Sequence, residues 1–550
     1  MIELTIDGKN LSVETGTTVM KAALQLDIKI PSMCHNGDLP QFTSCMICMV
    51  KDAKNGRLFT SCSVKATPGM NIITMDEEIH EARKTALDLL LSDHAGDCEA
   101  PCQTSCPAHM DIPLMNHLLA DGKFDKAYDV VIEDIALPSI LGRICPAPCE
   151  GACRRKSVDE AVSICLLKRF AGDFSAASKG PRLRGDDKSN CHPGEGRGEF
   201  RILNSEVEDP SIVKADSSLS QAEERPPLSR ERSERGRGAG GEVDHPSLEP
   251  APTKVGVTHH VAVIGSGPHG LSAAWYLQLF GYQCTIFDKN PLPGGALRYS
   301  VPKEKLPEEV LDQEIERIRQ AGVVYQMNSD MGPDRMKELE QEFDAVVYPL
   351  EKAPKMAIKA SALGKEAAWK VRQKLTGQPV IGEPRMFNSR FGRLQETESM
   401  EYLKESVPGN RIEPAGGLQE GLTPEEVMAE AARCLHCECR KPDSCLLRIY
   451  SNEYGADQKR FQGPRRKPVT KQFQHDTVVY EPQKCIKCGI CVRITAKHQE
   501  EYGLTFIGRG FDVVIGVPFS ESIREGLTHT AVEAANACPT GALAMKGGKG

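Results

Sequence analysis

The chain has 550 residues, of which 40% are hydrophobic and 26% are charged, and its formal net charge is −8. This length exceeds what one hydrophobic core supports, so we expect three or more domains, and the negative charge argues against nucleic acid as the main partner. The start lacks a basic and apolar leader, and no window approaches about 18 consecutive apolar residues, so we expect a cytoplasmic chain without a membrane span.

The 21 cysteines are the most informative residues of the chain. In a long chain without a secretion signal, so many cysteines indicate metal sites rather than disulfides. All but Cys191 and Cys284 fall into runs with the spacing of metal ligands. We find no serine or cysteine nucleophile set and no paired carboxylates, so no catalytic residue is assigned.

Residues 1–78 are expected to form a small β-grasp domain. The alternating segment Ile2–Ile6, the turn at Asp7 and Gly8 and a second short strand indicate a hairpin, and an amphipathic helix is expected over residues 19–26.

Four cysteines follow with the spacing C-x10-C-x2-C-x13-C, and they are Cys34, Cys45, Cys48 and Cys62. Four thiolates complete the iron coordination of a [2Fe–2S] cluster, and a zinc site or four free buried thiols is the alternative. The sequence of residues 30–34 and 44–50 resembles the N-terminal [2Fe–2S] domain of the large peripheral iron–sulfur subunit of respiratory complex I and of iron-only hydrogenases.

Residues 79–178 are expected to be helical and to hold two [4Fe–4S] clusters. The cysteines of this region are Cys98, Cys102, Cys106, Cys145, Cys149, Cys153 and Cys165. The run from His94 to Cys98 resembles the next cluster motif of the same complex I subunit. The later spacing instead resembles the N-terminal two-cluster domain of the glutamate synthase small subunit and dihydropyrimidine dehydrogenase. That resemblance implies two interleaved sets, Cys98, Cys102 and Cys153 for one cluster and Cys106, Cys145 and Cys149 for the other.

Each of these two sets lacks a fourth ligand. His94 stands where the family has its first cysteine, and a surface histidine that caps a turn is the alternative. The family's last ligand aligns with Lys168, which is a poor ligand while its amine is protonated. Cys165 lies one helical turn earlier on the same face and is the better candidate, with a small buried hydrophobe as the alternative.

Residues 179–257 are rich in glycine, proline, serine, glutamate and arginine and mostly lack hydrophobic periodicity. We predict a disordered insertion, with an ordered functional loop as the alternative.

Residues 258–375 are expected to form a Rossmann domain. A β-branched strand at residues 261–264 runs into a glycine-rich turn and a helix, and a second strand ends at Asp288. Residues 293–307 closely resemble the FAD-binding half of the glutamate synthase family, which implies FAD as cofactor. The candidate cofactor-binding residues are Gly265, Gly267, Gly270, Asp288, Gly294, Gly295, Leu297 and Arg298.

The second half of this nucleotide-binding unit is missing from the sequence. Family members insert a domain for NAD(P)H and return with a Gly-Asp motif, whereas here residues 344–348 run almost directly into residues 355–365, which resemble the final FAD helix. We therefore expect that the chain does not take hydride from a nicotinamide itself. A vestigial fold without flavin is the alternative.

Residues 376–475 are expected to be a connector, with a helix over residues 424–434 and a cysteine run. The run contains Cys434, Cys437, Cys439 and Cys445. We expect it to hold one [4Fe–4S] cluster, with structural zinc as the alternative.

Residues 476–550 are expected to form a ferredoxin-like [4Fe–4S] domain. Its ligands follow the bacterial ferredoxin spacing and are Cys485, Cys488, Cys491 and Cys538. Thr495 stands where two-cluster ferredoxins carry another cysteine, so one cluster is expected. Residues 507–512 resemble the complex I subunit and related hydrogenase and formate dehydrogenase subunits.

The sequence thus predicts a multidomain α+β and α/β mosaic with one [2Fe–2S] cluster, three to four [4Fe–4S] clusters and FAD. A flavin can exchange two electrons with one-electron clusters. We expect an electron-transfer subunit of a multi-subunit oxidoreductase, with a nicotinamide-, hydrogen- or formate-oxidising subunit or a ferredoxin as partner. The alternatives are a cluster-bearing scaffold that is not catalytic and a self-sufficient NAD(P)H-dependent oxidoreductase.

Overall fold

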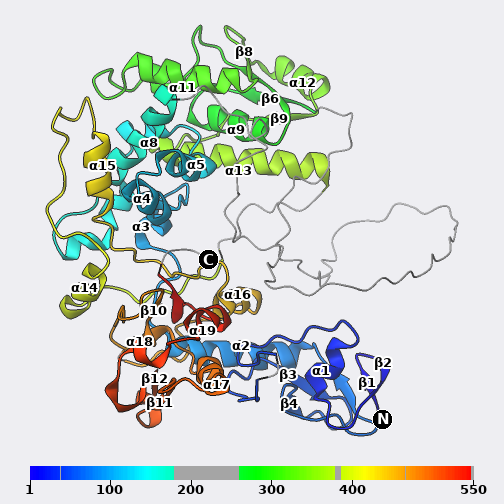
Figure 1. Ribbon diagram of the computed structural model, residues 1–550. Helices are drawn as coiled ribbons and strands as arrows, with labels where there is room; N and C mark the ends of the chain where they lie inside the picture. Colours follow the sequence, from blue (N-terminus) through cyan, green and yellow to red (C-terminus); the bar gives the residue numbers. More distant parts are fainter. Residues whose placement is uncertain (38, 179–258, 378–385, 465, 547–550) are drawn as a thin grey trace, which may run out of the picture.

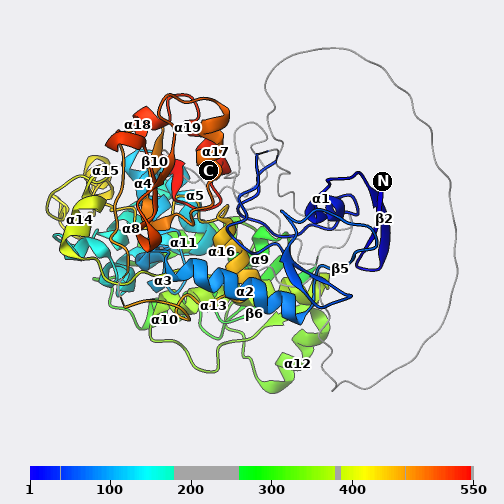
Figure 2. The same cartoon turned by 90° about the horizontal axis from the view of Figure 1, so that it is seen from below.

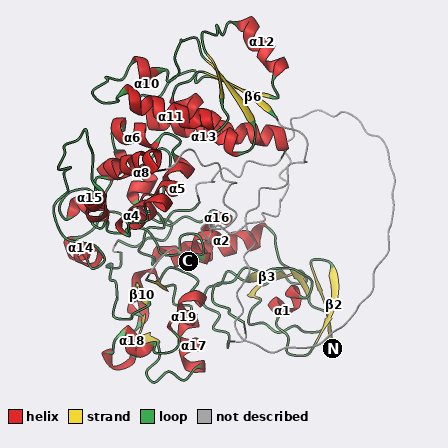
Figure 3. Ribbon diagram, turned by 45° about the horizontal axis from the view of Figure 1, so that its top comes forward, coloured by secondary structure: helices red, strands yellow, loops and turns green. Residues whose placement is uncertain are grey.

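The computed structural model describes residues 1–37, 39–178, 259–377, 386–464 and 466–546. The predicted insertion at residues 179–257 and Cys191 therefore lie outside the described residues. Strands are concentrated at the two ends of the molecule, and helices fill the middle (Figure 3). Among the described helices, none is both long and apolar enough to cross a lipid bilayer.

The N-terminal domain is a five-stranded sheet in the order β2-β1-β5-β3-β4, with one short helix packed on it. Its elements are β1 (Ile2–Ile6), β2 (Lys9–Val13), α1 (Val19–Leu24), β3 (Met49–Asp52), β4 (Leu58–Thr60) and β5 (Asn71–Ile73). The inward side chains of β1 alternate along the strand and share a core with Val19 and Ala22 of α1. The hairpin of β1 and β2 and the parallel pairing of β1 with β5 confirm the predicted fold.

The helical domain follows. Its elements are α2 (Glu77–Ser92), α3 (Pro101–Ser105), α4 (Ile112–Ala120), α5 (Phe124–Asp134), α6 (Pro138–Ile144), α7 (Pro148–Gly151) and α8 (Ile164–Ser178). Helices α6 and α8 cross closely because glycines stand at the contact. A Cβ on Gly142 would lie 2.6 Å from the Cα of Arg169, and one on Gly172 would lie 2.7 Å from the backbone nitrogen of Ser139.

The Rossmann domain is a four-stranded parallel sheet in the order β8-β7-β6-β9. Its elements are β6 (His260–Ile264), α9 (Pro268–Leu279), β7 (Gln283–Phe287), α10 (Ala296–Tyr299), α11 (Glu308–Gln320), β8 (Val324–Gln326), α12 (Pro333–Glu342), β9 (Ala345–Val347) and α13 (Ala357–Thr376). This domain shares one hydrophobic core with the helical domain. Both lie in the upper half of Figure 1.

The remaining elements connect the Rossmann domain to a C-terminal ferredoxin-like domain. They are α14 (Glu396–Leu403), α15 (Pro424–Ala431), α16 (Leu446–Glu453), β10 (Val478–Tyr480), α17 (Ile490–Lys497), β11 (Thr505–Ile507), β12 (Val514–Gly516), α18 (Ile523–Gly526), α19 (Ala531–Ala537) and β13 (Leu543–Met545). Helix α15 packs into the core of the helical domain, whereas β10 and β13 pair as an antiparallel ladder.

The chain leaves the lower half of the molecule after Cys98, and two later segments return beside that place. The first is residues 387–391, where the Ser389 hydroxyl donates to the Gly96 carbonyl at 2.9 Å and the Phe391 amide donates to Asp97 at 3.1 Å. In the second, the backbone N–H of Cys439 donates to the carbonyl of Cys98 at 3.1 Å. Residues before Cys98 and after Cys439 also pack on each other, because α2 lies against α16 and the buried Arg83 donates to Tyr454 Oη at 3.0 Å. Figures 1 and 2 both show α2 beside α16. The helical and Rossmann domains are therefore inserted between two halves of one ferredoxin-type unit.

Gly270 lies in the first turn of α9 and packs against the glycine-rich turn that precedes this helix. A Cβ at this position would stand 1.8 Å from the carbonyl oxygen of Gly265, so Gly270→Ala must displace backbone. We expect a loss of local stability of about 1–3 kcal/mol, measured as faster hydrogen exchange of the α9 amides in the full chain. Gly267→Ala is the matched control, since a Cβ there meets no atom within 4 Å. Equal exchange rates of these amides in the two variants would contradict this packing.

Candidate metal centres and dinucleotide site

The N-terminal site comprises Cys34, Cys45, Cys48 and Cys62, which are all buried. Their loop turns inward with positive φ at Thr43 and Met46. Hydrogen bonds from Cys45 and Cys62 hold the pKa of the Cys34 thiol below its ordinary value. A hydrogen bond from Cys62 lowers the pKa of Cys48 to about 7. The four thiols thus converge, and two of them favour the thiolate that iron binds.

The C-terminal site comprises Cys485, Cys488, Cys491 and Cys538, which line one small cavity. Apolar side chains such as Tyr480, Ile515 and Leu543 complete the lining. The loop between β10 and α17 makes this possible, because Lys487 and Gly489 adopt positive φ and turn the thiols toward the cavity. The structure therefore brings together all four sequence-predicted ligands of the ferredoxin-like domain.

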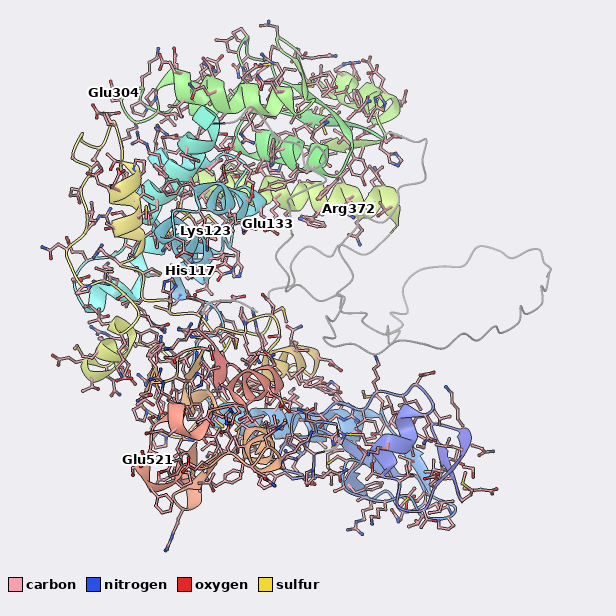
Figure 4. All side chains as sticks on the ribbon, viewed as in Figure 1. His117, Lys123, Glu133, Glu304, Arg372 and Glu521 are labelled. Carbon is pink, nitrogen blue, oxygen red and sulfur yellow. The ribbon has the colours of Figure 1, made fainter. Side chains whose placement is uncertain are left out.

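The inner site comprises Cys102, Cys153, Cys434 and Cys437, which line a second small cavity. Cys102 lies on α3, Cys153 follows α7, and the other two follow α15. Positive φ at His436 turns the chain between them. Asn116 of α4 is 1% exposed and hydrogen-bonds to Cys434, whose pKa burial raises to about 12. His117 of α4, labelled in Figure 4, has its ring 5.6 Å from that of His436.

The helical site comprises Cys106, Cys145, Cys149 and Cys165. Cys165 of α8 is hydrogen-bonded to both Cys145 and Cys149, and Lys168 lies close to all four thiols. The Lys168 ammonium is 3.9 Å from Cys165 Sγ, and the residue is 3% exposed. The structure thus places Cys165 as the fourth thiol and Lys168 as a buried cation beside the set.

The junction site comprises Cys98, Cys439 and Cys445. Burial, together with the nearby thiols of Cys445 and Cys439, raises the pKa of Cys98. Here the two halves of the ferredoxin-type unit meet, since the Cys439 amide bonds to the Cys98 carbonyl. A Cβ on Gly541 would lie 2.2 Å from Cys439 Sγ, so the backbone at Gly541 packs directly on this thiol.

His94 precedes Cys98 in the same loop, and it shares Lys484 as a neighbour with Cys439 of the junction site. Its Nδ1 is buried, and no described residue forms a hydrogen bond with it. Burial first, and then the charge of Lys484, lower the pKa of His94 to about 4. Lys484 also lies close to Cys439. A neutral imidazole with an unsatisfied buried nitrogen has the donor chemistry of a metal ligand.

The grouping of the middle cysteines differs from the sequence expectation. Cys98 was expected with Cys102 and Cys153, but it lies with Cys439 and Cys445. The run of residues 434–445, expected to hold one cluster, divides between the inner and junction sites. The reason is that the helical and Rossmann domains are inserted between Cys98 and Cys439. Cysteine spacing indicates which thiols are neighbours along the chain, and it does not show which distant thiols the fold brings together. Among the described residues, no three His, Cys, Asp or Glu side chains are arranged to hold a single metal ion.

The dinucleotide site lies where β6 runs into α9. Gly265 has φ of +90°, and Gly267 precedes the helix without a side-chain cap. A Cβ on Gly295 would lie 2.9 Å from the Cα of Gly267, so the loop of Gly294 and Gly295 packs directly on this turn. Uncapped amides at the start of a helix suit a pyrophosphate, and the backbone here fits such a group.

The other candidate cofactor residues have protein partners. Asp288 Oδ2 accepts from the Ser266 amide at 2.7 Å and from its hydroxyl at 2.6 Å, and Oδ1 accepts from Asn290. A ribose would have to compete for that carboxylate. Leu297 is 3% exposed within the core, and the Arg298 guanidinium is bound by Asp312 and by the Pro293 carbonyl. Leu297 and Arg298 therefore support the loop.

Three family models match parts of this chain. Residues 1–77 match a 2Fe-2S iron–sulfur cluster binding domain, residues 76–180 match the 4Fe-4S cluster domain II of dihydropyrimidine dehydrogenase, and residues 263–321 match an NAD(P)-binding Rossmann-like domain. Parts of the chain thus match three different domain types. The fold class and the domain resemblances expected from the sequence are confirmed.

Several curated proteins are similar over somewhat less than half of the chain. The beta subunit of the NADP(+)-dependent formate dehydrogenase of Moorella thermoacetica is 34% identical over 45% of this chain and 29% of its own. The NADPH-Fe(3+) oxidoreductase subunit beta of Geobacter sulfurreducens is 30% identical over 45% and 27%. The small chain of the Bacillus subtilis glutamate synthase [NADPH] is 26% identical over 46% and 40%. The aligned part thus spans less than half of each relative.

One solved structure, an NAD+-reducing [NiFe]-hydrogenase in the H2-reduced state, aligns with 99% of this chain and 87% of its own. The sequence identity is 11% and the TM-score is 0.33, and we draw no conclusion from it.

Proposed function

We propose that this chain is an iron–sulfur electron-transfer subunit of a multi-subunit oxidoreductase and relays single electrons between buried clusters. One observation carries the proposal: 19 of the 20 cysteines in the described residues gather into five sets, and only Cys284 stands apart. Four of these sets contain four thiols each, as [2Fe–2S] and [4Fe–4S] clusters require.

The donor chemistry of each site suggests its cluster. The N-terminal site has the three-on-one-loop arrangement of a [2Fe–2S] domain, and the C-terminal, inner and helical sites each offer four thiols for a [4Fe–4S] cluster. At the junction site His94 supplies a fourth ligand to a further [4Fe–4S] cluster beside three thiols. A zinc knuckle in residues 434–445 is disfavoured, because these four cysteines belong to two different sites.

The partner is proposed to be a nicotinamide-, hydrogen- or formate-oxidising subunit or a ferredoxin. Support comes from the relatives, since two of them are beta subunits of NADP(+)- or NADPH-dependent oxidoreductases. Anaerobic purification from the native source tests this proposal, because a redox subunit brings its partners with it. Recovery of the chain alone, with no cluster reducible by any physiological donor, would favour the scaffold alternative, in which the clusters only stabilise the fold.

We also propose FAD at the turn of Gly265, Gly267 and Gly270, with its pyrophosphate at the start of α9. This rests on the uncapped amides and the close glycine packing of that turn. A bound flavin would exchange electron pairs with one partner and single electrons with the clusters. Flavin extraction tests the assignment: about one FAD per chain supports it, and a flavin-free chain with full iron content contradicts it. If the isolated chain reduced a dye with NADH or NADPH, that result would instead support the alternative that the chain is a self-sufficient NAD(P)H-dependent oxidoreductase.

Lys168 should raise the reduction potential of the helical site. Its buried ammonium lies 3.9 Å from Cys165 Sγ and favours the more negative, reduced cluster. We expect Lys168→Met to lower the midpoint potential of one [4Fe–4S] signal by roughly 60 mV or more, which is about tenfold for one electron. A redox titration followed by electron paramagnetic resonance measures it.

The exposed Lys126 on α5 provides the matched control, Lys126→Met. Equal potentials in the two variants, at unchanged iron content, would show that the Lys168 charge does not act on the cluster.

A further inference from the structure

The side chain of Arg493 joins the first metal site of the chain to the last one. It lies on the first turns of α17, and one terminal nitrogen, Nη2, donates to the carbonyl of Cys34 at 3.0 Å and to that of Cys488 at 3.1 Å. Its other terminal nitrogen donates to the Pro40 carbonyl, and Nε donates to the Gly489 carbonyl at 3.0 Å. Cys34 belongs to the N-terminal site and Cys488 to the C-terminal site, so one guanidinium holds a ligand residue of each.

The surroundings of Arg493 fix the two loops against each other. Phe42, from the N-terminal loop, stacks on Phe506 of β11 with ring centroids 5.3 Å apart and an angle of 14° between the rings. The Arg493 guanidinium lies 5.9 Å from the centroid of Phe42. A Cβ on Gly489 would approach the Phe506 ring to 3.2 Å, so the rings close directly over this turn.

The two sites also share one hydrophobic core. Met33, Cys34, Cys45 and Ile47 pack in the same buried group as Ile486, Cys488, Ile490 and Ile494. Arg493 therefore adds hydrogen bonds to the carbonyls of both loops at the edge of this apolar contact. A planar guanidinium reaches several carbonyls at once, which a lysine ammonium on a flexible stem does not do in a fixed geometry.

We propose that Arg493 is a positioning residue that holds the loop of the N-terminal [2Fe–2S] site against the loop of the C-terminal [4Fe–4S] site, so that clusters bound there would exchange electrons directly. This inference rests on the proposed electron-transfer function. Clusters held by these cysteines would pass one electron from the reduced site to the oxidised site, with no bond made or broken. One polar connection runs from Cys34 through its carbonyl, the Arg493 guanidinium and the Cys488 carbonyl. The first cluster in the sequence is thereby connected to the last one.

The test uses the full chain, purified anaerobically with its clusters, as Arg493→Met, Arg493→Lys and the control Arg509→Met. Arg509 is exposed in the same domain. The first readout is the magnetic interaction between the two reduced clusters, seen as splitting or faster relaxation in electron paramagnetic resonance. The second, independent of cluster activity, is hydrogen exchange of the amides of residues 33–45. The expected gain in exchange for Arg493→Met is about 10- to 100-fold, because a hydrogen-bonded charge is lost.

The outcomes separate this inference from the proposed function. The positioning role of Arg493 is supported if Arg493→Met shows a weaker magnetic interaction and faster exchange. Arg493→Lys should then show a smaller effect, and Arg509→Met none. If all variants show the same magnetic interaction and the same exchange, the role of Arg493 is wrong but the electron-transfer function is untouched. The same holds if the two reduced clusters of the wild-type chain show no magnetic interaction. Absence of any reducible cluster in the unvaried chain defeats the proposed function itself. If Arg493→Met fails to fold, Arg493→Lys alone decides, because it keeps the charge and removes only the fork.

Discussion

Cys437→Ala is expected to remove one complete cluster, about four iron atoms per chain. The reason is that Cys437 lines the same cavity as Cys102, Cys153 and Cys434, although the chain makes a whole Rossmann domain between Cys153 and Cys434. A [4Fe–4S] cluster needs one protein ligand for each iron, so three thiols leave one iron without a ligand. Iron and sulfide analysis of the anaerobically purified variant measures the loss.

The matched control for this prediction is Cys284→Ala. Cys284 is 1% exposed on β7 and lies apart from the five cysteine sets, so its removal should leave the iron content unchanged. A second comparison separates the inner site from the junction site: Cys98→Ala should remove the junction cluster and leave the inner one. If Cys98→Ala and Cys437→Ala abolish the same spectroscopic signal, the division of residues 434–445 between two sites is wrong.

Arg433→Met is expected to cost about 3–5 kcal/mol of local stability, because it leaves a buried carboxylate without its cation. Glu430 is fully buried and accepts from Arg433 Nη1 at 2.8 Å and from the Ser163 amide at 2.7 Å. Arg433, which is 2% exposed, also donates to Asp159 at 3.0 Å. These bonds fasten the end of α15, and with it Cys434, to the helical domain. The variant should therefore lose part of the inner cluster as well.

Hydrogen exchange of the α15 amides measures this cost locally, which suits a chain of several domains whose unfolding is not a single transition. Arg390→Met is the control, since Arg390 is exposed and surface changes of this kind stay within about 0.5 kcal/mol. The double variant Arg433→Met with Glu430→Gln should recover part of the loss, because it removes the unpaired charge. No recovery would mean that lost packing, and not the carboxylate, carries the effect.

Local patterns in the sequence were sufficient for the folds of the separate domains. Alternation in β1, the glycine-rich turn after β6 and the ferredoxin spacing around Cys485 each depend on neighbours in the chain, and each appears where it was expected. A resemblance to one family also suggested how Cys98 pairs, and there it failed. The family pattern covers only residues around the helical domain, whereas the junction site forms where the ends of the insertion meet.

The sequence did contain a signal for that correction. Two sets in the helical domain each lacked a fourth ligand, while the irregular run of residues 434–445 held four cysteines within twelve positions. Two thiols from that run complete the inner site, and the other two reach Cys98. Arg493 and Arg433 carried no signal of this kind, because what they do depends on carbonyls and carboxylates that only the folded chain brings to them.

The most direct test of the account is the metal content of the intact, anaerobically purified chain, measured together with acid-labile sulfide. One [2Fe–2S] cluster and four [4Fe–4S] clusters predict about 18 iron atoms per chain, the same number of sulfides and no zinc. About six iron atoms, with zinc at the remaining thiols, would leave only the N-terminal and C-terminal clusters and would contradict the relay through the middle of the molecule.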